Sequence, residues 1–364
     1  MGITYNNMVF DLNEDGTYCV SKYLGSDNCV CIPNEINGIG VTTIGYYFYW
    51  NNKINHIKFG SNIKRLEYCY NMCLESVEFD ENTTLEEIND RAFYYCINLK
   101  TIKIPRSIKR IGVDAFLDCK SLENVIFEKG CELETIDHGA FADCENLKTI
   151  TIPKSVGELG NRIFSYCTNL NEVIFEDGIH LKSIGMYAFR NSGIKNIQIP
   201  YGIDKIRRET FYYSKLEKII MPNSIKEIGI SAFNSCEFLT DVVFSNNLTN
   251  IEETAFMACY KLEKINFPKS LRTIAVDSFL CCIMLRTFTT EDVVSNNVAD
   301  YILRYALEIN NDGLILDKYL NVITKKQYDK LISIARKDKL ISCLAILISN
   351  YHKRFGENKK IHLS

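Results

Sequence analysis

Cysteine thiols are the groups in this sequence whose spacing comes closest to a chemical site. Seven of the 15 cysteines follow a phenylalanine by three positions, namely Cys96, Cys119, Cys144, Cys167, Cys236, Cys259 and Cys282. Thiols stacked one coil apart would lie close enough for a disulfide or a bound metal. However, serine takes the same place at Ser192 and Ser214, no histidine accompanies the column, and a buried thiol packs as a small apolar group. We therefore interpret the column as core packing.

The remaining reactive residues do not form a recognisable constellation in the sequence. The pairs Cys29/Cys31, Cys69/Cys73 and Cys281/Cys282 lack the second half of a zinc site. None of the five histidines recurs at a spacing that would pair it with a Cys or Ser nucleophile: His56, His138, His180, His352 and His362. The phosphate-binding, dinucleotide-binding and HExxH metal motifs are absent. We expect no cofactor, no metal and no catalysis.

The cysteine spacing belongs to a longer repeat, which is clearest in residues 92–116, AFYYCINLKTIKIPRSIKRIGVDAF. An anchor aromatic residue recurs at intervals of 22 to 25 residues, at Phe48, Tyr70, Phe93, Phe116, Phe141, Phe164, Phe189, Phe211, Phe233, Phe256 and Phe279. Self-similarity at this period is typical of solenoids. The sequence therefore predicts a mostly β repeat solenoid of the α/β type, with about eleven coils.

Each coil contains two short segments with strand character. Leu99, Ile102 and Ile104 alternate with polar residues, and Pro105 follows at once, which indicates a strand with one buried face that the proline ends. A second extended segment, such as IKRIG in residues 108–112, is expected on the opposite side of the coil. Coils about 4.8 Å apart would make an array roughly 50 Å long.

The two ends of the chain differ from the repeat. We predict an N-terminal cap in residues 1–45, with a β-hairpin around Asp15-Gly16, and a solenoid in residues 46–290. Residues 291–356 read as a helical C-terminal region with helices at 325–337 and 339–355. Thr324 with Gln327 forms a capping box, Gly356 ends the last helix, and residues 357–364 form a flexible tail.

Composition limits the partners and the location. The formal net charge of −3 gives no general attraction to nucleic acid. The apolar run 340–348 is too short to span a membrane. The chain begins without a basic segment followed by an apolar one, so we expect a cytoplasmic protein, or a cell-surface or secreted one if a leader was removed. The oligomeric state is left open.

Variable positions of the repeat are the candidate binding residues. Aromatic residues stand one or two positions after the anchor at Trp50, Tyr94, Tyr95, Tyr166, Tyr212 and Tyr213, where they could anchor a partner or merely shield the turns. The outer strand face carries β-branched apolar residues at Ile126, Ile174, Ile220 and Val243. They could form a contact surface, or they could simply suit a strand and be covered by another segment.

The pattern AFxxCxxLxxIxIPxSIxxIGxxAF resembles the leucine-rich repeats of the BspA type, over about residues 30–288. Departures are the shortened coil at Tyr70–Val77 and the serines at Ser192 and Ser214. The resemblance implies a curved solenoid of parallel strands that binds a protein partner and carries no catalytic residues. Two alternatives remain open: a surface adhesin that binds a host protein or glycan, and an enzyme or effector whose activity lies in the helical C-terminal region.

Overall fold

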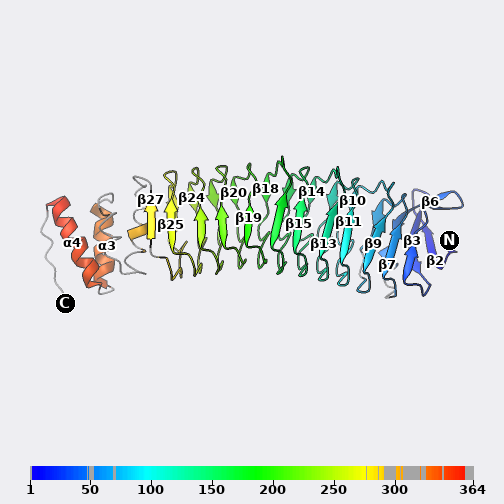
Figure 1. Cartoon of the computed structure of the whole chain (residues 1–364), viewed down its shortest axis with the longest axis horizontal. Coiled ribbons are helices and arrows are strands. Elements are labelled where there is room, and N and C mark those ends of the chain that lie inside the picture. The colour runs from blue at the N-terminus through cyan, green and yellow to red at the C-terminus, as the bar shows by residue number, and fades with distance from the viewer. Residues whose placement is uncertain are drawn as a thin grey trace.

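The chain forms an elongated stack of coils, with its N-terminus at one end and two helices beyond the other (Figure 1). The computed structural model describes residues 2–46, 48, 53–68, 71–275, 277–285, 287–290, 301–303, 305, 320, 325–337 and 340–356. Strands dominate throughout the repeat. The predicted mostly β solenoid of about eleven coils is therefore confirmed.

One side of the stack is a ladder of parallel strands, one from each coil. Most neighbours pair in register, as in Ile102↔Val125 and Ile219↔Val242, and breaks in the pairing divide the ladder into four sheets. The alternation predicted for Leu99–Ile104 is present, because Ile102 and Ile104 are buried whereas Thr101 and Lys103 are exposed. The strands are β4 (Cys29–Cys31), β7 (His56–Phe59), β9 (Ser76–Phe79), β11 (Thr101–Ile104), β13 (Asn124–Phe127), β15 (Thr149–Ile152), β17 (Glu172–Phe175), β19 (Asn196–Gln198), β21 (Lys218–Ile220), β23 (Asp241–Val243), β25 (Lys264–Phe267) and β27 (Thr287–Thr290).

The opposite side carries a second ladder made of two-residue strands. In nearly all of them the second residue is a buried Ile or Leu that faces the core. These strands are β8 (Arg65–Leu66), β10 (Glu87–Ile88), β12 (Arg110–Ile111), β14 (Thr135–Ile136), β16 (Glu158–Leu159), β18 (Ser183–Ile184), β20 (Lys205–Ile206), β22 (Glu227–Ile228), β24 (Asn250–Ile251) and β26 (Thr273–Ile274). Coils approach closely here: a Cβ added at Gly112 would lie 2.6 Å from the backbone nitrogen of Asp90, so only glycine fits.

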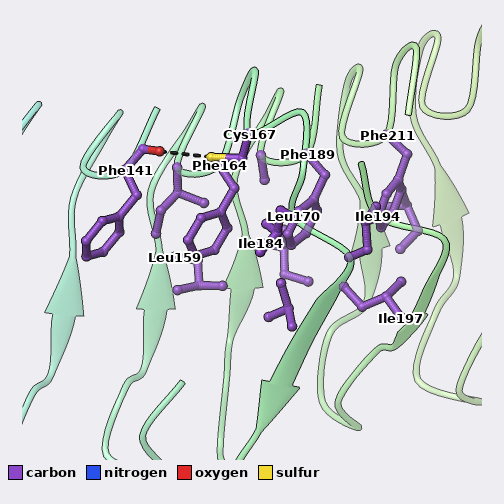
Figure 2. Close-up of a cluster of buried hydrophobic side chains, with 14 of the residues drawn as sticks. Phe141, Leu159, Phe164, Cys167, Leu170, Ile184, Phe189, Ile194, Ile197 and Phe211 are labelled. Atoms are coloured by element: carbon purple, nitrogen blue, oxygen red, sulfur yellow. Dashed lines mark hydrogen bonds between the residues drawn. The ribbon is translucent and has the colours of Figure 1, made fainter. Parts of the chain in front are cut away.

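Between the ladders, the anchor phenylalanines form one continuous column. Rings from Phe93 to Phe279 are fully buried, and consecutive ring centroids lie 4.9 to 6.0 Å apart with nearly parallel planes. Figure 2 shows four of these rings beside buried leucines and isoleucines of the same coils. Each ring is covered by the coil on either side, so a single coil could not bury its own anchor.

The turns that hold the anchors form a third ladder. Backbone N–H groups of Arg91, Phe93 and Tyr95 donate to carbonyl oxygens of the next coil at 2.9, 2.8 and 2.8 Å. The first and last of these residues have positive φ angles, +58° and +61°. Other coils repeat this arrangement. Inter-coil hydrogen bonds therefore hold non-glycine residues in a conformation that costs about 1–2 kcal/mol each.

The N-terminal end closes with an antiparallel sheet. β2 (Met8–Leu12) and β3 (Tyr18–Tyr23) form the predicted hairpin, and β1 (Ile3–Tyr5), which the sequence analysis did not predict, pairs with β2. β3 pairs in parallel with β6 (Ile39–Ile44), which is joined to β5 (Glu35–Ile36) and to β8. The long ladder already begins at β4, inside residues 1–45, so the repeat and the proposed cap overlap.

At the C-terminal end, helix side chains continue the core. The Tyr301 ring lies 6.2 Å from that of Phe279, and the Tyr305 hydroxyl donates to the Cys282 carbonyl at 3.1 Å. Further along, α3 (Lys325–Lys337) packs against α4 (Ile341–Phe355), and its buried residues are Tyr328, Leu331, Ile332 and Ala335. α4 begins at residue 341 rather than 339 because Leu340 is not helical, and it ends at Gly356 as predicted. Thr324, Asp338 and the tail 357–364 lie outside the described residues.

Candidate functional site

The thiol column is buried, and six of its seven thiols donate to backbone oxygens. From Cys119 onward, the Sγ of a column cysteine donates to the carbonyl oxygen of the anchor phenylalanine in the preceding coil, at 3.0 to 3.3 Å. The bond from Cys167 to Phe141 is drawn in Figure 2. These bonds explain why the pocket takes a thiol, which can donate as well as pack. Ser192 lacks the equivalent contact and makes no side-chain hydrogen bond within the described residues.

Burial also makes these thiols unreactive. Loss of hydration raises the pKa of Cys236 to about 12 and holds the pKa values of Cys119, Cys144, Cys167 and Cys259 well above the ordinary value. A thiol that keeps its proton is neither a nucleophile nor a metal ligand. The predicted role in core packing is therefore confirmed for this column, and no group of three metal-binding side chains occurs among the described residues.

One histidine does lie beside a serine, which the sequence spacing did not indicate. His56 Nδ1 on β7 is hydrogen-bonded to Ser76 Oγ on β9, because the two residues are partners in the strand register. Both residues lie within paired strands of the ladder. We interpret it as a cross-strand contact on the sheet surface.

The apolar candidates on the long ladder lie in a single row. Ile126, Ile174, Ile220 and Val243 occupy equivalent positions of β13, β17, β21 and β23, and they are 50, 43, 56 and 48% exposed. No described segment covers them. The equivalent positions of the earlier strands hold charged residues: Lys58 pairs with Glu78 at 2.7 Å, and Lys103 pairs with Glu128, which follows β13, at 2.6 Å. From Ile126 onward the row itself holds no charged residue, although charged side chains such as Lys218 and Asp241 flank it on the same face.

The aromatic candidates divide into two kinds. Tyr94 and Tyr212 directly follow an anchor and are half-buried against neighbouring residues; the Arg190 guanidinium lies 4.9 Å from the Tyr212 ring centroid. Tyr166 and Tyr213, at the next position, are more exposed, at 37 and 50%, and Tyr95 at that position is half-buried. Trp50 lies outside the described residues.

Two tyrosines that the sequence analysis missed extend this aromatic surface. Tyr46 stacks on Tyr68 and Tyr68 contacts Tyr94, with 5.5 Å between ring centroids in both pairs, and Tyr94 contacts Tyr95 at 6.1 Å. Four rings from three successive coils thus form one cluster. Tyr46 and Tyr68 precede their anchors by two positions, whereas Tyr94 follows its anchor, so a comparison of equivalent positions cannot find the contact.

Comparisons with known proteins agree with this architecture. A family model described as BspA type leucine rich repeat region, in six copies, matches residues 42–171 and 158–286. None of the curated proteins matches the chain significantly. No helix among the described residues is long and apolar enough to cross a membrane.

Several solved bacterial structures are similar at low identity. The pneumococcal vaccine antigen PcpA is 23% identical, with 82% of each chain covered and a TM-score of 0.57. A leucine-rich repeat protein from Bacteroides ovatus is 24% identical over 81% of this chain and 91% of that one (TM-score 0.49), and a leucine rich cell surface protein from Faecalibacterium prausnitzii is 23% identical over 80% and 95% (TM-score 0.42). With two-thirds of its length matched by the family model, this chain belongs to the BspA-type leucine-rich repeat family.

Proposed function

We propose that this protein binds a partner protein, without catalysis, on the outward face of its long ladder. The observation that carries the proposal is the row formed by Ile126, Ile174, Ile220 and Val243, whose side chains are about half exposed on an otherwise polar sheet. From β13 to β23 the row extends over five coil intervals, about 24 Å at 4.8 Å each. Apolar side chains held on a rigid surface favour association because little conformational entropy is lost when they are buried.

Burial of this row would supply a useful part of a binding free energy. Full burial of an Ile or Val side chain contributes about 1.5–3 kcal/mol. Since each residue has already buried about half of its surface, the partner would gain about 1 kcal/mol from each, or about 4 kcal/mol in all. Exposed tyrosines at the turns, Tyr166 and Tyr213 in particular, would add contacts at the rim.

The test compares two double variants in the same row. Ile174→Thr with Ile220→Thr keeps β-branched side chains on both strands but removes much of the apolar surface. Thr151→Ser with Gln198→Ser changes the intervening strands β15 and β19 and serves as the matched control. Both proteins should keep the melting temperature of the parent within a few degrees, because the altered side chains are exposed.

The readout is quantitative capture of interacting proteins from the native host, followed by titration of the partner that the parent chain retains. We expect the isoleucine variant to bind about 10- to 30-fold more weakly, since two contacts of about 1 kcal/mol are lost, and the control to bind like the parent. Equal binding by all three proteins would exclude the sheet face. A partner that binds only an isolated fragment 291–364 would favour the alternative of an activity in the helical region.

A further inference from the structure

The long ladder has an open edge at its N-terminal end. Its first sheet has the order β13-β11-β9-β7-β4, so β4 is the last strand. The Asn28 carbonyl accepts from the His56 N–H at 2.9 Å, and the Ile32 N–H donates to the Lys58 carbonyl at 2.8 Å. Because backbone groups of successive residues point to alternate edges of a strand, the N–H and C=O groups of Cys29 and Cys31 point away from β7. Within the described chain, no strand pairs with that side of β4.

The three residues of β4 include two cysteines. Cys29 and Cys31 are exposed and free, whereas Val30 between them is buried. Their side chains therefore lie together on the outward face of the sheet. The N-terminal antiparallel sheet does not use this edge, since β3 pairs with β6 and so joins the short ladder instead. An edge strand with unpaired backbone groups is a ready template for another strand.

We propose that a second copy of this chain pairs with β4 in antiparallel orientation about Val30, and that oxidation locks the pair through two disulfides between Cys29 of one copy and Cys31 of the other. In this register the two cysteines are directly opposite each other, and the two-fold axis generates the contact twice. Both residues would exchange backbone hydrogen bonds, which places their Cα atoms about 5.5 Å apart. That separation is within the usual range for a disulfide.

A second copy fits this edge better than an unrelated peptide because the sequence Cys29-Val30-Cys31 is its own complement in an antiparallel register. A foreign strand could use the same backbone groups, but it would leave both thiols without a partner. Three residues on each side bury much less than the roughly 1,000 Å² of a stable interface. Backbone pairing therefore positions the thiols, and the covalent bonds supply the stability.

The chemistry needs an oxidant, which we take to be a small disulfide such as oxidised glutathione. The Cys29 thiolate attacks the glutathione disulfide, forms a mixed disulfide and releases one glutathione thiolate. The Cys31 thiolate of the second copy then attacks the protein sulfur and releases the second glutathione. Each protein disulfide thus consumes one glutathione disulfide and returns two reduced glutathiones, so the two bonds of a dimer consume two.

The test uses the full chain with oxidised glutathione, non-reducing electrophoresis and light scattering. The parent protein should change from a monomer of 41.9 kDa to a covalent dimer of twice that mass, and a reductant should reverse the change. Cys29→Ser alone and Cys31→Ser alone should remain monomeric, because each homodimer would lack one member of every pair. Cys281→Ser, which removes another exposed thiol, should dimerise like the parent.

Mixing the two single variants gives the decisive measurement. Cys29→Ser keeps Cys31 and Cys31→Ser keeps Cys29, so an equimolar mixture should restore a covalent dimer that contains one copy of each, joined by one disulfide. Mass spectrometry of the linked tryptic peptides identifies this heterodimer. A covalent dimer formed by either variant alone, or a mixture that stays monomeric while the parent dimerises, would overturn the antiparallel register. A parent chain that stays monomeric would overturn the proposal as a whole.

Discussion

The buried thiol column predicts that this protein loses stability steeply in mild alkali. Cys119, Cys144, Cys167, Cys236 and Cys259 all have pKa values raised by burial above the ordinary 9.0. In the unfolded chain these thiols release their protons near pH 9, whereas in the folded chain they keep them. The folded state then binds more protons, so stability is complete below pH 9 and falls as the pH rises.

The size of the loss follows from the same difference in pKa. Between pH 8 and pH 10 an unfolded thiol with a pKa of 9 gains about 1.4 kcal/mol of ionisation free energy that a fully buried thiol does not. Five such thiols together lower the free energy of unfolding by about 7 kcal/mol. This is comparable to the whole stability of an ordinary domain, about 5–15 kcal/mol. The pH range lies mainly below the ionisation of lysine and tyrosine, so the thiols dominate it.

Urea unfolding followed by circular dichroism at pH 8, 9 and 10, with a reductant present, measures the effect. Cys167→Ala with Cys236→Ala should be less stable than the parent at pH 8, but it should lose about 3 kcal/mol less between pH 8 and pH 10. Cys281→Ala, at an exposed site, should keep the pH dependence of the parent. If the double alanine variant and the parent lose stability equally, the explanation by buried thiols is wrong.

Three further predictions test the packing. Under native conditions at neutral pH, a chromogenic disulfide reagent should modify the exposed Cys29, Cys31 and Cys281 within seconds and leave the column thiols unmodified until urea is added; rapid modification of the column would contradict its burial. Phe189→Ala should destabilise the protein by about 3–5 kcal/mol in urea titrations, and Phe189→Leu by clearly less, because leucine refills most of the space between rings 5.7 and 5.3 Å away. Cys281→Gly should stabilise by about 1 kcal/mol, since Cys281 has a φ of +62°, whereas Leu280→Gly next to it should destabilise; the same sign at both positions would refute the argument from backbone strain.

The features of the fold that could be predicted from the sequence are those that recur in every coil. Phe116 and Phe141 have the same surroundings because each lies between two other anchor rings, so the period of the sequence is also the period of the core. Strand alternation and the prolines follow for the same reason. A solenoid has few contacts between distant coils, and a local pattern is therefore enough to indicate its architecture.

The third ladder could not be predicted because its residues adopt the same backbone conformation but are of different amino-acid types. Positions two residues beyond the anchor hold Tyr95, Asp118, Asn191 and Ala258, all with positive φ. Glycine or asparagine would normally indicate such a conformation. Here hydrogen bonds to the next coil fix the backbone whatever the side chain is. The partner of each column thiol was hidden for a similar reason, since it is a backbone oxygen about 26 residues earlier.

Contacts on the surface depend on irregular coil lengths. His56 and Ser76 meet although they are only 20 residues apart, because the coil between them is short, whereas Ser76 pairs with Thr101, 25 residues further on. Tyr68 and Tyr94 meet from different positions of their coils. A fixed period therefore identifies the exposed rows correctly but does not identify which side chains come together across coils.

The strand register further predicts which residues of the proposed binding row contribute most to the binding free energy. Ile220 and Val243 are direct partners on adjacent strands, so they form one uninterrupted apolar surface. Ile126 lies between Lys103 and the strand that carries Thr151, and Ile174 lies between Thr151 and Gln198. A partner that covers an isolated isoleucine must also remove water from the polar neighbours, which offsets part of the gain. The contribution to binding should therefore be larger at Ile220 and Val243 than at Ile126, and the centre of the interface should lie on β21 and β23.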